Sequence, residues 1–178
     1  YSHMKKAELV LKGYVSESSS TQLTSLNIAI NGGLAMGHYW KGRLLLEQAK
    51  QDHDRCNDYK DAAIASFCAT NVTERFDHLP ENADEDAAPQ LSPPQWLSAI
   101  ELLRYPDRAV FRVDRRMVFQ TIYQKLTQQV EEVQSDNIQI HRLTKKDVRS
   151  NLERCLDMVK AQFPDKEPLI QKMIRSIR

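Results

Sequence analysis

The sequence contains little cysteine and no paired cysteine motif. Its three cysteines, Cys56, Cys68 and Cys155, are odd in number, and none lies in a Cys-x-x-Cys spacing. A disulfide framework in a secreted chain uses an even set of cysteines at compact spacings. The usage instead favours reduced thiols, and we expect an intracellular protein, cytoplasmic or nuclear.

Long apolar runs are also missing. No window approaches the roughly 20 apolar residues that a membrane-spanning helix needs, and no basic flank precedes an apolar run of signal-peptide length. We therefore expect no membrane span. Residues 1–4, Tyr-Ser-His-Met, have the look of a cloning remnant, and we leave them out of the fold prediction.

Glycine, proline and aromatic residues are scarce. The chain of 178 residues holds 5 glycines and 7 prolines, and its aromatic share is 7%. Sheets with many turns need more turn residues than this, so the composition favours helices. We predict an all-α fold, a helical bundle or stacked helical hairpins, with six to seven helices.

Apolar residues recur at steps of three and four along most of the chain, as the buried face of a helix requires. Starts and stops are marked by Asn31-Gly32-Gly33, by Asp58, by Ser92-Pro93, by Asp114, by Thr144 with Asp147, by Pro164 and by Pro168. The predicted helices cover residues 21–31, 34–50, 58–79, 93–103, 114–133, 144–163 and 168–177, and residues 5–15 are compatible with a further short helix. Residues 109–113 alternate enough for a short strand.

Residues 80–94 differ from the rest because they hold four prolines and four acidic residues without periodicity. A stretch of this length and composition predicts a linker or loop. It would join an N-terminal helical hairpin layer, residues 5–79, to a C-terminal helical layer, residues 95–178, and we expect the two layers to pack as one domain.

Charge is distributed unevenly although the net charge is only +1. Residues 5–50 carry six basic and three acidic side chains, residues 51–90 carry three and ten, and residues 91–178 carry sixteen and eleven. An acidic middle between two basic flanks can steer the association of a partner or hold the two halves of the chain together by charge attraction. The charge counts alone do not distinguish these two roles.

Gly42 and Leu45, followed by Ala63 and Phe67, loosely resemble the small and large positions of the helix pairs in tetratricopeptide-like repeats. The separation between the two sets is too long for that family and no second copy follows, so the pattern assigns no family. It predicts an antiparallel pair of long helices. In this pair we expect Tyr39 and Trp40 to be core residues; the alternative is an aromatic groove for a partner helix.

Sites for metals and catalysis are poorly supported. His53, Cys56, Cys68 and His78 are residue types that bind zinc, but their gaps are wide and irregular. The acidic residues between 52 and 81 lack the paired motifs of a magnesium site, and no nucleophile elbow or phosphate-binding glycine loop is present. We predict no metal, no cofactor and no catalytic residue.

The segment 104–116, RYPDRAVFRVDRR, has five arginines and two aspartates. Arg115 and Arg116 follow Asp114 in the first turn of a predicted helix, the reverse of what the helix dipole prefers. Three explanations stay open: pairing within the chain, contact with carboxylates of a partner, and contact with a phosphate backbone.

These patterns together favour a protein-interaction, adaptor or regulatory domain that binds a partner through a groove between helices and an arginine-rich segment. One alternative is nucleic-acid binding by the basic C-terminal half; a second is an enzyme whose residues assemble only in the fold. The oligomeric state is open. The predicted partner-binding residues are Tyr39, Trp40, Arg104, Arg108, Arg112, Arg115 and Arg116.

Overall fold

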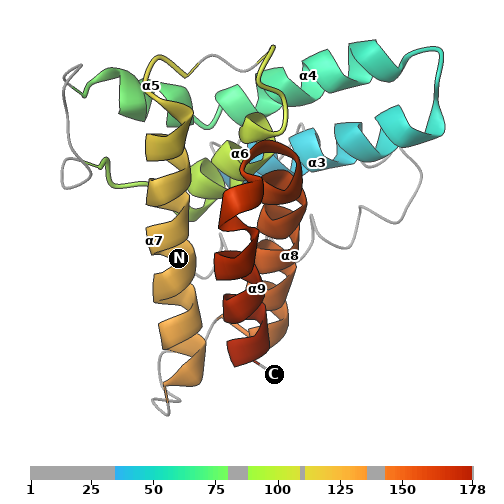
Figure 1. Cartoon of the computed structure of the whole chain (residues 1–178). Helices are drawn as coiled ribbons and strands as arrows, with labels where there is room; N and C mark the ends of the chain where they lie inside the picture. Colours follow the sequence, from blue (N-terminus) through green and yellow to red (C-terminus); the bar gives the residue numbers. More distant parts are fainter. Residues whose placement is uncertain (1–34, 80–87, 109–110, 136–142, 178) are drawn as a thin grey trace. The chain divides into compact units, whose positions relative to one another are not determined.

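The computed structural model describes residues 35–79, 88–108, 111–135 and 143–177 (Figure 1). Within these ranges the chain forms seven α-helices and a short 3-10 turn, with no strand, which confirms the all-α prediction. The helices are α3 (Ala35–Gln51), α4 (Cys56–Cys68), α5 (Val72–Asp77), α6 (Pro93–Leu103), α7 (Arg115–Gln134), α8 (Lys145–Gln162) and α9 (Glu167–Ser176). The helix predicted over 21–31 and the possible short one over 5–15 lie outside the described residues.

The chain divides into two compact units. The described part of the first unit is residues 35–75 with 91–98, and that of the second is residues 76–79, 88–90, 99–108, 111–135 and 143–177. Helix α6 contributes residues 93–98 to the first unit and 99–103 to the second. None of the described helices is long and apolar enough to cross a membrane.

In the first unit, α3 and α4 form the predicted hairpin of two helices. The chain reverses over residues 52–55, where a carboxylate oxygen of Asp52 accepts a hydrogen bond from the backbone N–H of Arg55 at 3.3 Å. The buried side chains of this unit come mainly from the facing sides of the two helices: Tyr39, Trp40, Leu44, Leu45, Leu46, Ala49, Ala63, Ile64 and Phe67.

The helix predicted over residues 58–79 was wrong at both ends. The observed helix α4 begins at Cys56, so Asp58 lies in its first turn instead of capping it, and α4 ends at Cys68. Asn71 adopts a φ of 66°, a left-handed conformation that a helix interior does not allow, and α5 starts directly after it. The apolar pattern hid this break because Val72 and Phe76, on α5, are as buried as the residues of α4.

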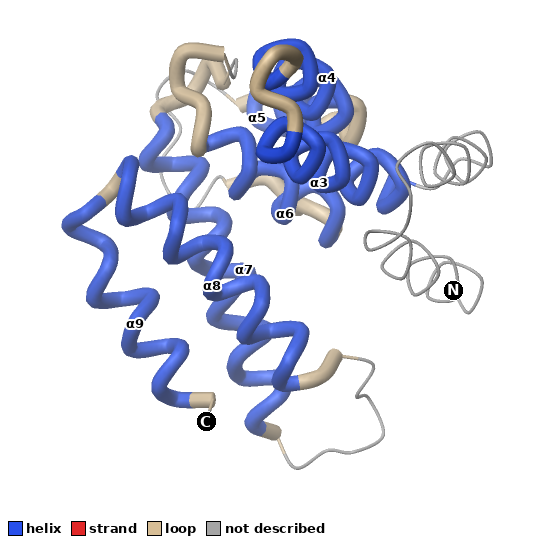
Figure 2. Tube along the Cα trace, turned by 90° about the vertical axis from the view of Figure 1, so that its right-hand side faces the viewer, coloured by secondary structure: helices blue, strands red, loops and turns tan. Residues whose placement is uncertain are grey.

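The second unit is built around α7, α8 and α9 (Figure 2). Their apolar stripes face one another and bury Val118, Ile122, Leu126, Val148, Leu152, Met158, Ile170 and Met173, among others. The side-chain amide of Asn151 on α8 donates to that of Gln129 on α7 at 3.1 Å. Because each helix carries a single apolar stripe, packing against the others is what removes that stripe from water.

Most predicted starts and stops are confirmed. Asp114 caps α7 by accepting from the Arg116 backbone N–H at 2.9 Å, and Thr144 with Asp147 forms a capping box on α8. Pro93 is the first residue of α6, and the 3-10 turn η3 (Pro164–Lys166) separates α8 from α9. The possible strand is not confirmed: residues 111–113 form bends and loop, and residues 109–110 lie outside the described part.

Candidate functional site

Gly42 on α3 and the ring of Phe67 on α4 determine how closely the two helices approach each other. A Cβ placed on Gly42 would lie 2.5 Å from a ring carbon of Phe67, so only glycine permits this approach of the two helices. Tyr39 packs against Phe67 with ring centroids 6.0 Å apart and against Trp40 at 5.2 Å. All three rings are buried.

Burial supports the core interpretation of Tyr39 and Trp40, which are 2% and 8% exposed. The guanidinium of Arg43 lies over the Trp40 ring at 4.7 Å from its centroid. Direct contact of these rings with a partner stays a prediction.

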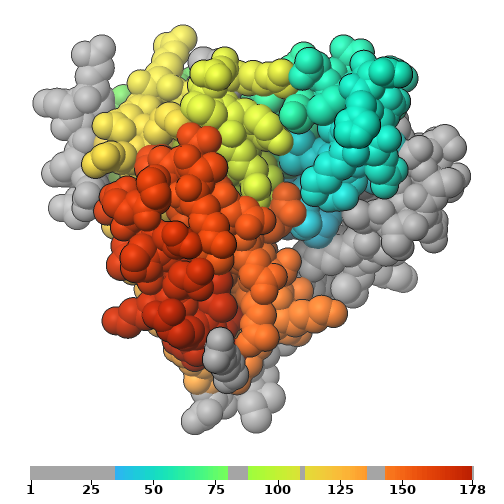
Figure 3. All heavy atoms as spheres, turned by 45° about the vertical axis from the view of Figure 1, so that its right-hand side comes forward, coloured from blue at the N-terminus to red at the C-terminus, as the bar shows by residue number. Residues whose placement is uncertain are grey.

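A groove of about 460 Å³ runs along the same helix pair. One of its sides presents Ala62 and Ala65 of α4 and Ala69, the residue directly after α4; the three are exposed and recur at steps of three and four. Leu45 supplies an apolar surface from α3, and Ser66 turns its hydroxyl away by donating to the Ala62 carbonyl at 3.1 Å. Figure 3 draws this helix pair in blue to turquoise. Small side chains leave room for another backbone to come close.

The polar groups of the groove are His38 and Lys41, both on α3. Burial lowers the pKa of His38, and the positive charge of Lys41 lowers it further. His38 is therefore neutral at pH 7, and Lys41 is the cation that lines the groove.

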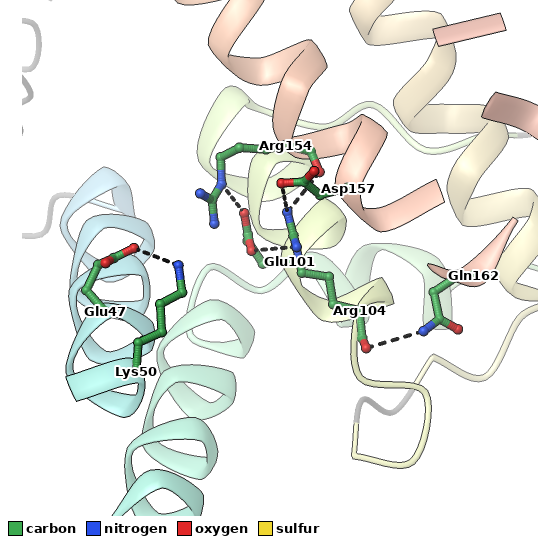
Figure 4. A network of polar contacts seen from close by, with 7 residues as sticks. All are labelled: Glu47, Lys50, Glu101, Arg104, Arg154, Asp157 and Gln162. Carbon is green, nitrogen blue, oxygen red and sulfur yellow. Dashed lines mark hydrogen bonds and ion pairs between the residues drawn. The ribbon is translucent and has the colours of Figure 1, made fainter. Parts of the chain in front are cut away.

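Arg104 and Arg115, two arginines of the 104–116 segment, bind other groups within the second unit. The partner of Arg104 is the buried carboxylate of Glu101. Glu101 is 1% exposed, and its two carboxylate oxygens meet Arg154 Nε at 2.5 Å and Arg104 Nε at 3.1 Å (Figure 4). Arg104 also donates from Nη2 to the Arg154 backbone carbonyl at 2.9 Å. A buried carboxylate is thus held between two guanidinium groups.

Arg115 explains the reversed charge order at the start of α7. Its Nη2 donates to the backbone carbonyl of Leu103, the last residue of α6, and its guanidinium lies 5.7 Å from the centroid of the Phe163 ring. Burial lowers the pKa of this guanidinium, opposed by the nearby Asp107 carboxylate. The Arg115 guanidinium thus stabilises the C-terminal end of α6, where positive charge is favourable. The same charge is unfavourable at the start of α7, on which Arg115 lies.

Arg108, Arg112 and Arg116 are exposed. The five arginines therefore differ in exposure: Arg104 and Arg115 are half-buried and bind within the unit, and Arg108, Arg112 and Arg116 are exposed. Sequence periodicity does not show this difference, because it depends on where the end of α6 and the side of α8 lie.

No group of three or more His, Cys, Asp or Glu side chains gathers to hold a metal ion among the described residues. Burial raises the pKa of Cys155 to about 12 and also raises that of Cys68. Both thiols therefore stay protonated near neutral pH and lack the thiolate that a nucleophile needs.

Comparisons of the chain with protein-family models, with curated proteins and with solved structures each gave no match.

Proposed function

We propose that the chain is a helical interaction domain that holds a helix of a partner protein in the groove between α3 and α4. The observation that supports this most is the row of exposed alanines, Ala62, Ala65 and Ala69, beside the apolar Leu45. A groove with small walls and an apolar floor is the form in which a helix is commonly received by a helical domain.

The side chains of the groove indicate the chemistry of the partner. Lys41 is the basic residue of the groove, and its side chain is half-buried. An amphipathic partner helix would bring small apolar side chains onto the alanine row and a carboxylate toward Lys41.

The exposed arginines Arg112 and Arg116 suit the same partner. Exposed cations speed the encounter with an acidic protein, and salt weakens this effect because exposed charges are screened. In this proposal the groove provides most of the affinity and the arginines raise the association rate.

The test compares Ala65→Arg, which fills the groove, with Gln51→Arg, an exposed position at the end of α3 outside it. The full chain is used to capture a protein from its native cells, and that protein is then purified and titrated by calorimetry. We expect Ala65→Arg to weaken binding about tenfold or more, which is about 1.4 kcal/mol, and Gln51→Arg to leave it near the original value.

Equal binding by both variants would overturn the groove as the site. A binding segment that gains no helix when it binds, measured by circular dichroism, would overturn the proposed partner.

A further inference from the structure

Three helix ends meet at one end of the second unit. Helix α7 ends there, α8 begins and α9 ends, as two views agree (Figures 1 and 2). Gln134 on α7 donates to the Ser176 carbonyl at 2.7 Å, and Arg149 on α8 donates to the Ile177 carbonyl at 3.3 Å. Side chains of α8 and α9 therefore share this surface.

Five exposed basic residues lie on the parts of α8 and α9 nearest this end, and we name them the basic end: Lys145, Lys146 and Arg149 in the first turns of α8, and Lys172 and Arg175 in the last two turns of α9. Figure 3 shows the surfaces of α8 and α9 in orange and red. Glu131 and Glu132, on the last turn of α7, are exposed at the same end, and Asp147 is used in the capping box of α8. Positive charge is in excess.

Most of these cations have no counterpart in the described part of the chain. Lys145, Lys146 and Arg175 form no hydrogen bond or ion pair there, whereas Arg104 and Arg115 each bind neighbouring groups. Glu131 and Glu132 do not pair with the lysines either, although they lie at the same end.

The position of the two lysines is unfavourable for the helix itself. Lys145 and Lys146 are the first two residues of α8, where the helix dipole presents partial positive charge and an acidic side chain would stabilise. At the start of α7 the same conflict is offset by the bond from Arg115 to the Leu103 carbonyl. No such bond offsets it at α8 in the described residues, so the arrangement fits an external anion.

We propose that the basic end binds the phosphate backbone of a duplex nucleic acid. Lysine and arginine side chains make most of the phosphate contacts by which proteins hold DNA. Single strands are held largely by aromatic side chains that stack on bases, and none of the five residues is aromatic. Leu169, the one large apolar side chain that the described residues expose, lies in the first turn of α9, away from the basic end, so no apolar anchor for a membrane accompanies the charges.

The experiment measures binding of the full chain to a fluorescent DNA duplex of about 20 base pairs by anisotropy, between about 50 and 200 mM salt. The informative variant is Lys146→Glu. Its matched control is Lys160→Glu, an exposed lysine in the last turn of the same helix. We expect Lys146→Glu to weaken binding about tenfold and to lower the slope of log affinity against log salt by about one, while Lys160→Glu changes either quantity little.

Thermal unfolding separates loss of binding from loss of fold. Lys146→Glu places an acid at the positive end of α8 and should raise the melting temperature, whereas Lys160→Glu places one at the negative end and should lower it. Saturable binding that weakens in the more stable variant supports the proposal. The absence of saturable binding at the lowest salt would overturn the proposal, and so would an equal loss of affinity in both variants. Tighter binding to a single strand or to phosphatidylserine vesicles than to the duplex would also overturn it. The groove proposal is tested with different residues and does not depend on this result.

Discussion

Arg154 donates from Nε to a carboxylate oxygen of Glu101 over 2.5 Å, across 53 residues of sequence. Glu101 is on α6 and almost fully buried, while the side chain of Arg154 on α8 is 23% exposed. Arg104 binds the second oxygen of the same carboxylate. A charge this deep is tolerated because both of its oxygens have cationic partners.

Removing this buried charge is therefore expected to cost stability. Glu101→Gln keeps the shape but leaves two arginines without their anion, and we expect a loss of about 2–3 kcal/mol in the free energy of unfolding. Asp157→Asn is the control, because Asp157 meets Arg104 at 3.9 Å and its side chain is 67% exposed; its cost should stay below about 1 kcal/mol. Urea denaturation measures both, and equal losses would contradict the assignment.

Gly42 offers a test of the α3–α4 contact. Gly42→Ala should lower the free energy of unfolding by about 1–3 kcal/mol, because its Cβ would press into the Phe67 ring. Phe67→Leu removes the ring carbons in the way. The added cost of Gly42→Ala in a Phe67→Leu background should therefore be smaller, and a double-mutant cycle gives the coupling. If the stability losses of the two substitutions are additive, the Cβ added at position 42 does not clash with the Phe67 ring.

The lowered pKa of His38 predicts that the stability of the folded chain depends on pH. Its pKa in the folded chain is lowered, so the unfolded chain binds the proton more readily, and stability falls as the pH drops through the ordinary histidine value of about 6.5. Melting temperatures of the chain and of His38→Gln at pH 7.5 and 5.5 check this. The variant should lose less stability between the two pH values than the original chain; an equal or larger loss would show that His38 does not contribute.

Arg115 and Arg116 should respond differently to substitution although they are neighbours. Arg115→Gln removes the bond to the Leu103 carbonyl and is expected to cost about 1.5–3 kcal/mol of stability. Arg116→Gln removes an exposed cation from the start of α7 and should change stability by about 0.5 kcal/mol or less, towards a gain. Thermal denaturation distinguishes the two, and similar effects would contradict the difference between the half-buried and the exposed arginines.

The exposed arginines predict a kinetic effect on partner binding. Arg112→Glu combined with Arg116→Glu should slow association with the captured partner by about tenfold at low salt and leave the melting temperature almost unchanged. Surface plasmon resonance at two salt concentrations measures this, and the difference should shrink at the higher one. A change confined to the dissociation rate would count against steering.

Much of the secondary structure was predictable from local patterns. The apolar stripe of α7, the Asp114 cap and the capping box of Thr144 with Asp147 depend on residues within a turn or two of one another. The break between α4 and α5 was not predicted, because Asn71 gave no stronger signal than the surrounding helical pattern. A groove between helices was predicted, but its lining by Ala62, Ala65 and Ala69 was not, since exposed alanines appear in sequence as ordinary helix residues.

The sequence by itself determined that the chain is helical and where most helices begin and end, because hydrophobic periodicity and capping act over a few residues. Only the tertiary structure decided which arginines are half-buried and which are exposed. It also decided that Gly42 meets Phe67 and that Ala62, Ala65 and Ala69 border a groove. These facts depend on contacts between residues far apart in the chain, and no local pattern records which distant group a side chain will meet.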